Sequence, residues 1–153
     1  RSPSGAIFSA DMVFRYVLWR VWGKGQKFVH ICGLNPSKAD ARLDDPTIRR
    51  EISFAVAWGF DGLIKTNAFA FRATDPLEMI AAKDPIGPEN DNYIEFCRAA
   101  CLLNVAAWGT HIPHLGRDKH MLSFGSWQCL GKTQKGHPKH PLYLPKGTEL
   151  VEL

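Results

Sequence analysis

The sequence predicts a single α/β domain in which helices cover both faces of a parallel sheet. Short apolar runs, such as residues 28–32 and 102–108, alternate with segments in which apolar residues recur every three or four positions. Turn-forming Gly, Pro, Asn and Asp separate these segments. Strands that alternate with helices favour right-handed crossovers and therefore parallel pairing. The length of 153 residues suits one hydrophobic core, so residues 1–153 are expected to form one domain.

The N-terminal part is predicted to lead into the sheet. Residues 1–6 are expected to be flexible. Residues 14–22 are aromatic and β-branched but alternate imperfectly, which predicts an edge strand or a hairpin partner. A Gly-Lys-Gly turn follows, and residues 27–32 are predicted to form the first central strand.

The first central strand ends in the run Gly33-Leu34-Asn35-Pro36-Ser37, which turns the chain sharply. Open α/β sheets place their ligand crevice at the carboxyl ends of such strands, so Asn35 is a candidate site residue. The alternative is that Asn35 only caps the turn.

A helix is predicted to begin at Pro46, with Asp45 as its N-cap, and to end at Gly59. Capping already accounts for Asp44 and Asp45, although both could instead be functional carboxylates. The second strand is predicted at residues 62–68 and ends in the polar pair Thr66-Asn67.

The remaining elements follow the same alternation. Thr74 or Asp75 is expected to cap a short helix that reaches about Ala82, and Pro88 to begin a helix that reaches about Ala100. The later elements are a strand at residues 102–108, a loop and helix at 112–124, a short strand at 126–130 and a final loop.

Composition favours an anionic partner. The net charge is +4 and the pI is about 9.0, and residues 131–147 contain four lysines and two histidines but no acidic residue. A solvated lysine-rich loop is the alternative. No signal peptide and no apolar run of about 18 residues is recognisable, which disfavours secretion and membrane spanning.

The four cysteines form no Cys-x-x-Cys pair, so no zinc or redox motif is expected. We expect buried free thiols and a reducing, cytoplasmic location. Neither a metal nor a cofactor is expected.

Polar side chains follow four predicted strands where each strand ends. They are Asn35, Asn67, His111 and His137. Because the carboxyl ends of parallel strands meet at one edge of a sheet, these side chains are expected to converge on one site.

Four segments carry a resemblance to a known family: residues 33–37, 44–50, 84–91 and 136–143. Together they resemble the domain of unknown function 1643 family. The resemblance covers nearly the whole chain, but the family name carries no established activity.

A more distant resemblance concerns the strand ends. Gly33-Leu34-Asn35-Pro36-Ser37 is similar to the first motif of the uracil-DNA glycosylase superfamily. The Thr66-Asn67 pair, residues 107–111 and residues 136–138 resemble its later motifs in the same order. This resemblance implies a three-layer α/β/α domain with a short central parallel sheet that works without a metal, and we expect a monomer.

The resemblance also implies roles for individual residues. Asn35 would orient a water molecule and Asn67 would hydrogen-bond the base edge. His137 would stabilise charge on the departing base, with His140 as a substitute. The remaining implied roles are stacking on the base by Phe69 and Phe71, an apolar wedge at Leu142, and phosphate contacts by Lys38, Arg72 and Lys139.

The chain also departs from the superfamily pattern. Ser37 replaces a glycine, and the inserted Lys139-His140 leaves the choice between the two histidines open. No counterpart is evident for Asp40, Asp44, Asp45 and Arg49, which would either recognise the substrate or order the loop.

The leading hypothesis is a DNA glycosylase-like hydrolase that cleaves the N-glycosidic bond of a deaminated, mismatched or modified base. One alternative is a hydrolase of free nucleosides or nucleotides. The other is a binding module for nucleic acid or nucleotides that has the pocket but no chemistry.

Overall fold

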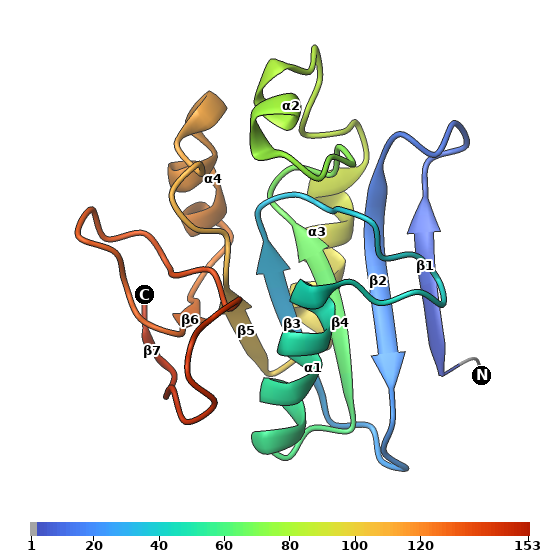
Figure 1. Cartoon of the computed structure of the whole chain (residues 1–153), viewed down its shortest axis with the longest axis vertical. Helices are drawn as coiled ribbons and strands as arrows, with labels where there is room; N and C mark the ends of the chain where they lie inside the picture. The colour runs from blue at the N-terminus through green and yellow to red at the C-terminus, as the bar shows by residue number, and fades with distance from the viewer. Residues whose placement is uncertain (1–2) are drawn as a thin grey trace.

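A mixed seven-stranded sheet with four α-helices forms the fold in a computed structural model, which describes residues 3–153 (Figure 1). The spatial order of the strands is β1-β2-β4-β3-β5-β6-β7. Their bounds are β1 Ser4–Phe8, β2 Arg15–Val21, β3 Phe28–Gly33, β4 Gly62–Asn67, β5 Leu103–Ala106, β6 Gln128–Cys129 and β7 Val151–Glu152. The helices are α1 Pro46–Ala57, α2 Pro76–Ala81, α3 Asn90–Ala100 and α4 Arg117–Ser123, the last preceded by the 3-10 turn η1 His114–Gly116.

The four central strands are parallel. β3 pairs with β4 from Phe28↔Gly62 to Gly33↔Asn67, β5 pairs with β3, and β6 pairs with β5. The remaining pairs, β1–β2, β2–β4 and β6–β7, are antiparallel. The prediction of an α/β fold with a parallel sheet is therefore correct for the centre and wrong for the edges. The connection between β1 and β2, residues 9–14, is too short for the crossover that parallel pairing requires.

The N-terminal segment differs from the expectation. Of residues 1–6, which were expected to be flexible, residues 4–6 belong to β1 at the sheet edge, and residues 1 and 2 lie outside the described part. β2 is the hairpin partner of β1 and also pairs with β4, so it lies inside the sheet rather than at its edge. The two-residue strand β7 was not expected at all.

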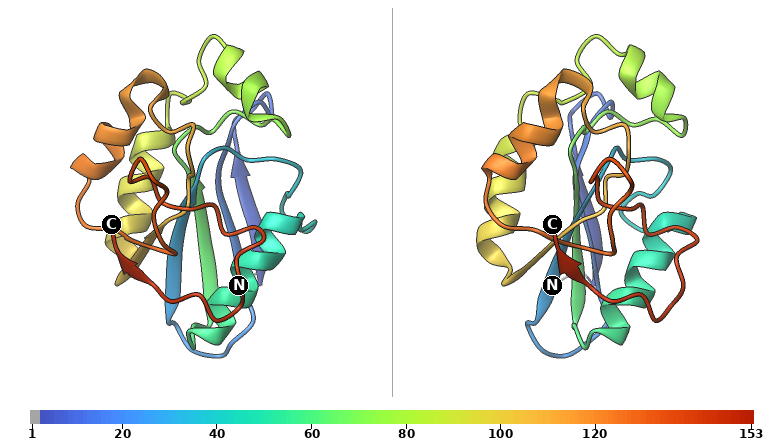
Figure 2. Two further views of the ribbon diagram at one scale, coloured as in Figure 1. Left: turned by 60° about the vertical axis from the view of Figure 1, so that its left-hand side comes forward. Right: turned by 90° about the vertical axis from the view of Figure 1, so that its left-hand side faces the viewer.

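Helices lie on both faces of the sheet. α1 covers one face, whereas α3 and α4 cover the other (Figure 2). The α1 face buries Val29 and Ile31 of β3 and Leu63 of β4, and the opposite face buries Cys32 of β3 together with Trp108 and Trp127. This alternation along β3 and β4 follows the two-residue period of a strand.

The predicted helix starts are confirmed by their caps. Asp45 accepts a hydrogen bond from the backbone N–H of Ile48 at α1, and Asp75 accepts one from Leu77 at α2. In both helices a proline follows the cap directly. α3 begins at Asn90, two residues after the proline that was expected to start it.

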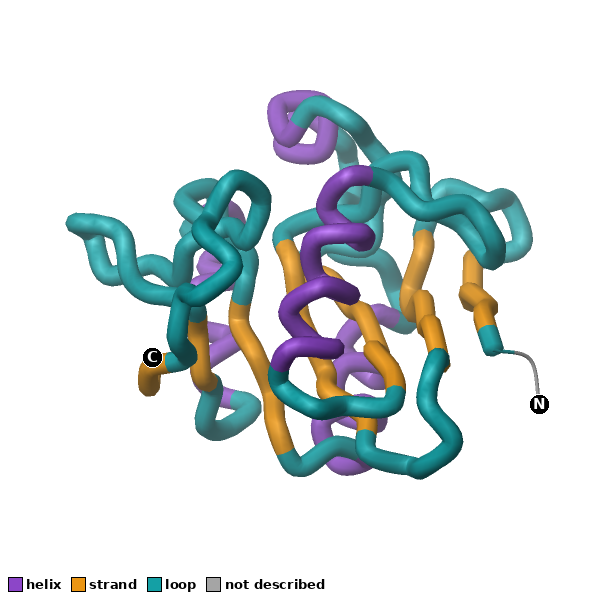
Figure 3. The backbone as a smooth tube through the Cα atoms, turned by 60° about the horizontal axis from the view of Figure 1, so that its bottom comes forward, coloured by secondary structure: helices purple, strands orange, loops and turns teal. Residues whose placement is uncertain are grey.

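The two ends of the described chain lie at opposite edges of the sheet, β1 near one and β7 near the other (Figure 3). All four cysteines are buried and unpaired, as expected. Within residues 3–153, no helix is long and apolar enough to cross a membrane.

Candidate functional site

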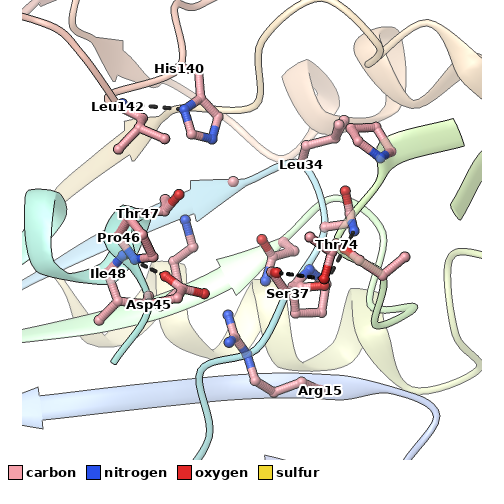
Figure 4. Close-up of a pocket in the computed structure, with 17 residues that line it drawn as sticks. Arg15, Leu34, Ser37, Asp45, Pro46, Thr47, Ile48, Thr74, His140 and Leu142 are labelled. Carbon is pink, nitrogen blue, oxygen red and sulfur yellow. Dashed lines mark hydrogen bonds between the residues drawn. The ribbon is translucent and has the colours of Figure 1, made fainter. Parts of the chain in front are cut away.

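A cavity of about 310 Å³ opens at the carboxyl ends of β3 and β4, next to the N-terminus of α1 (Figure 4). We call it the β3–β4 cavity. Its lining comes from six separate parts of the chain: Arg15, residues 33–37, residues 45–48, Lys65 with Asn67, residues 73–76 except Asp75, and His140 with Leu142. Two of the four strand-end side chains that were expected to converge, Asn35 and Asn67, therefore do so.

Asn35 is half-buried on the wall of the cavity. Its amide nitrogen donates to the carbonyl oxygen of Ala73 at 2.8 Å and to that of Pro36 at 3.2 Å. These bonds tie the loop after β3 to the segment after β4 and fix the orientation of the amide. Its Oδ1 accepts no hydrogen bond from the described residues, so it can serve a ligand or a water molecule.

Asn67 is 2% exposed, and its Nδ2 has no hydrogen-bond partner in the described chain. The Asn67 backbone is fixed, because it pairs with Gly33 and its carbonyl oxygen accepts from Asn90 Nδ2 at 2.8 Å. A buried donor without a partner costs about 1–3 kcal/mol. Its position on the cavity wall points to a ligand that accepts from it.

A buried ion pair lies beside Asn67, and the sequence analysis did not single it out. Lys65 Nζ contacts Glu51 Oε2 of α1 at 2.8 Å, with the two side chains 4% and 0% exposed. Lys65 lines the cavity and Glu51 does not, so the positive end of the pair faces the cavity. The signal was present in the sequence as a lysine inside a strand predicted to be buried.

Gly33 provides the space for this lysine. A Cβ at Gly33 would lie 2.5 Å from Lys65 Nζ and 2.9 Å from Asn67 Oδ1. Both distances are shorter than real Cβ contacts, so any larger residue would displace one of the two side chains. The glycine at the end of β3 is thus needed for close approach rather than for an unusual backbone angle.

Arg15 and Asp45 also line the cavity, and the sequence analysis assigned no site role to Arg15. The Arg15 guanidinium is 2% exposed and donates to the carbonyl oxygen of Ala39 at 3.0 Å, while its Nε has no partner in the described chain. Burial lowers the pKa of Arg15 to about 10, so it stays charged at neutral pH. Asp45 is occupied by backbone N–H donors from Ala39 and Ile48.

His140 reaches the cavity from the C-terminal loop. The Gly109 N–H donates to the carbonyl oxygen of Pro138 at 2.9 Å, which anchors this loop just beyond β5. Leu142 N–H donates to His140 Nδ1 at 3.2 Å, so the neutral ring carries its proton on Nε2 (Figure 4). Desolvation, and then the charge of Lys65, lower the pKa of His140 and keep it neutral at pH 7.

Other expected site residues lie elsewhere. His137 belongs to a hairpin in which Lys132 pairs with Pro138, and it does not line the β3–β4 cavity, so His140 occupies the place that the sequence analysis assigned first to His137. His111 is exposed, also away from the cavity. Phe69 is fully buried in the core, with its ring 5.7 Å from that of His114, and is not in a position to stack on a base in this cavity.

A shallow groove adjoins the cavity and contains three more of the expected residues, Lys38, Phe71 and Arg72. Ser37, Ala73 and Thr74 line both the groove and the cavity. Arg72 lies over the Phe8 ring at 4.7 Å and donates to the carbonyl oxygen of Met12. The exposed Lys139 lies outside this groove, beside Gly131.

The loop before α1 is ordered by residues for which the glycosylase superfamily pattern has no counterpart. Asp44 pairs with Arg20 at 2.7 Å, and Asp40 Oδ1 accepts from the backbone N–H groups of Arg42 and Leu43. Arg49 donates to the carbonyl oxygen of Asp44. No group of three or more His, Cys, Asp or Glu within residues 3–153 is arranged to hold a metal ion.

Comparison with known proteins gives one match. A family model described as a protein of unknown function, DUF1643, matches residues 15–142, which include every lining residue of the β3–β4 cavity. Neither a curated protein nor a solved structure matches the chain.

Proposed function

Because the chain belongs to DUF1643, a family whose description assigns no activity, we propose a function from the β3–β4 cavity: hydrolysis of the N-glycosidic bond of a base in DNA. The observation that carries the proposal is the buried, unpartnered amide nitrogen of Asn67. Asn67 lines the same cavity as His140 and as Asn35, whose Oδ1 has no partner among the described residues.

An amide suits the edge of a nucleobase because it offers a donor and an acceptor side by side. Asn67 Nδ2 would donate to a carbonyl oxygen or ring nitrogen of the base, and Oδ1 would accept from a neighbouring N–H. A cavity of about 310 Å³ lies at the small end of ligand sites, which suits a single base rather than a larger cofactor. A base in duplex DNA reaches such a cavity by leaving the stack.

The chemistry requires a positioned water molecule. Cleavage of the C1′–N bond leaves both electrons on the base and forms an oxocarbenium-like sugar, to which water adds. The oxygen of the water forms the new bond to C1′, and its proton passes to solvent while the departed base takes up a proton. Asn35 Oδ1 would orient this water, but an amide cannot remove its proton as a carboxylate would.

His140 supplies a neutral donor on the same cavity. With Nδ1 accepting from Leu142, its Nε2–H is free to donate to the base or to a sugar oxygen. Because its pKa is lowered, His140 is expected to act by hydrogen bonding rather than as a cation near neutral pH.

Contacts to DNA would come from the surroundings of the cavity. Lys38 and Arg72 in the adjoining groove, and Lys139 of the basic segment 131–147, are the proposed phosphate contacts. Leu142 lies on the cavity wall and is the apolar side chain proposed to occupy the space left in the stack.

The direct test uses oligonucleotides that contain uracil, hypoxanthine, or hydroxymethylated or glucosylated bases, with abasic-site formation as the readout. The wild-type protein should release one of these bases, and Asn35→Ala and Asn67→Ala should lose at least about 100-fold in rate. Asn92→Ala, an exposed position on α3, is the matched control and should retain full activity. Release that persists in both cavity variants would contradict the proposal.

A binding module without catalysis is the second candidate. It is favoured by one observation: Asp45 is the one carboxylate that lines the cavity, and backbone N–H groups already occupy it. Salt-dependent binding to DNA without release of any base would select this candidate. Release of bases from mononucleotides but not from oligonucleotides would instead select a nucleotide hydrolase.

A further inference from the structure

Two basic side chains, Arg15 and Lys65, are among the described residues that line the β3–β4 cavity. Lys65 is the one on the same strand as Asn67, and neither the family description nor the resemblance assigns it a role. It lies two residues before Asn67 on β4, so both side chains point to the α1 face of the sheet. Through the gap left by Gly33, the ammonium group and the Asn67 amide come to the same point of the cavity wall.

The charge of Lys65 is held in place. Glu51 accepts from Nζ at 2.8 Å and is fully buried behind it, away from the cavity. If Lys65 served only to neutralise Glu51, its ammonium group would need neither the space left by Gly33 nor exposure to the cavity. The second oxygen of Glu51, Oε1, has no partner in the described chain, so the pair itself is not an optimised structural ion pair.

A departing base needs a positive charge more than it needs a proton. When the C1′–N bond breaks, the negative charge of the base spreads onto its ring nitrogens and carbonyl oxygens. A fixed cation in a desolvated site stabilises such charge as it develops, without transferring a proton. His140 is kept neutral and therefore cannot provide that charge near pH 7.

We propose that Lys65, oriented by Glu51, is the group that stabilises the negative charge of the departing base. This inference rests on the function proposed above. It also predicts the class of base. A base with a carbonyl oxygen facing Lys65 would accept a hydrogen bond from its ammonium group, whereas an exocyclic amino group there would place a donor against a donor.

The test measures binding of free bases, which does not depend on catalysis. Uracil and hypoxanthine are titrated into the protein across pH, and ultraviolet difference spectra report when the bound base loses its N–H proton. In the wild-type protein the bound base should lose this proton at a pH at least about one unit below that of the free base, a tenfold preference for the anion. Adenine, which has no carbonyl oxygen, should bind at least about tenfold more weakly than uracil and hypoxanthine.

Three variants isolate the charge. Lys65→Met should abolish the preference for the anion while the neutral base still binds to Asn67. The double variant Lys65→Met/Glu51→Gln leaves no unpaired buried charge, so it keeps the test valid if the single variant does not fold. Lys83→Met removes an exposed lysine and should leave the preference unchanged.

The variant Glu51→Gln tests whether Glu51 positions the Lys65 ammonium group or only fills space in the core. Without its carboxylate partner, the Lys65 ammonium group is no longer held at the cavity wall, so the preference for the anion should weaken in this variant while the neutral base still binds. The titratable groups that interact electrostatically with Lys65 are Glu51, His30, Cys32 and His140. Asp45 and Arg15 line the same cavity. A parallel titration of His140→Gln controls for the histidine that shares the cavity.

The outcomes distinguish this inference from the proposed function. An anion preference that persists in Lys65→Met, with uracil and hypoxanthine still bound, would overturn the role of Lys65 and leave the proposed function standing. If no base binds the wild-type protein at all, both fail. Loss of the preference in Lys65→Met, with its retention in Lys83→Met, supports the role.

Discussion

At the scale of single residues, the buried side chain of Asn67 is expected to contribute to ligand binding but little to stability. Its Nδ2 gains nothing from the fold because no described residue accepts from it. Asn67→Ala should therefore change the free energy of unfolding by less than about 1 kcal/mol, since it also removes an unsatisfied donor. The same variant should bind uracil or hypoxanthine at least about tenfold more weakly than the wild type. Urea denaturation and calorimetric titration measure the two effects, and a large loss of stability would show that Asn67 has a structural partner.

His30 predicts how stability depends on pH. Its ring is fully buried between Thr66 Oγ1 at 2.7 Å and Asn104 Oδ1 at 2.8 Å, and burial lowers its pKa to about 4. The unfolded chain takes up this proton near pH 6.5, so stability is lost as the pH falls from about 6.5 towards 4.

Between pH 7 and pH 5 this histidine alone should cost about 2 kcal/mol of unfolding free energy. Urea denaturation at both pH values should give a smaller decrease for His30→Gln than for the wild type. All other titrating groups are present in both proteins and cancel in the comparison. An equal decrease would mean that His30 takes up its proton at the same pH in the folded and the unfolded chain.

At the scale of elements, α1 depends on Asp45 more than α2 depends on Asp75. Both aspartates cap a helix whose next residue is proline, but Asp45 also accepts from the backbone N–H of Ala39 and lies on the cavity. Asp45→Ala should lower the free energy of unfolding by about 1–2 kcal/mol, and Asp75→Ala by about 0.5–1 kcal/mol. Chemical denaturation of the two variants provides a matched comparison. Equal losses would show that the bond to Ala39 adds nothing.

The elements also show which local patterns are informative. The Asp-Pro pairs predicted the starts of α1 and α2, because a cap and its proline act within three residues of each other. Strands β6 and β7 have two residues each. Such short strands carry no period of their own, and their pairing is decided by the neighbours they meet.

At the scale of the whole molecule, the cavity is completed by a segment more than a hundred residues after β3. The contact between Gly109 and Pro138 places His140 on the cavity and leaves His137 in the hairpin beside it. His140→Ala should weaken base binding at least about fivefold, which corresponds to one hydrogen bond of about 1 kcal/mol. His137→Ala, the matched control, should bind as the wild type does. Calorimetric titration measures the base affinity of both variants. A weaker affinity in His137→Ala than in His140→Ala would show that His137, and not His140, contacts the base.

The sequence by itself determined the α/β class, the alternation of buried strands and capped helices, and the position of Asn35 and Asn67 at strand ends. These features depend on residues a few positions apart, whose periodicity and turn chemistry are visible in one dimension. Only the tertiary structure decided that Lys65 pairs with Glu51 beside Gly33, that His140 rather than His137 lines the cavity, and that the sheet has antiparallel edges. Each of these depends on contacts between distant segments, and the free energy of such contacts comes from burial and register, which no local pattern encodes.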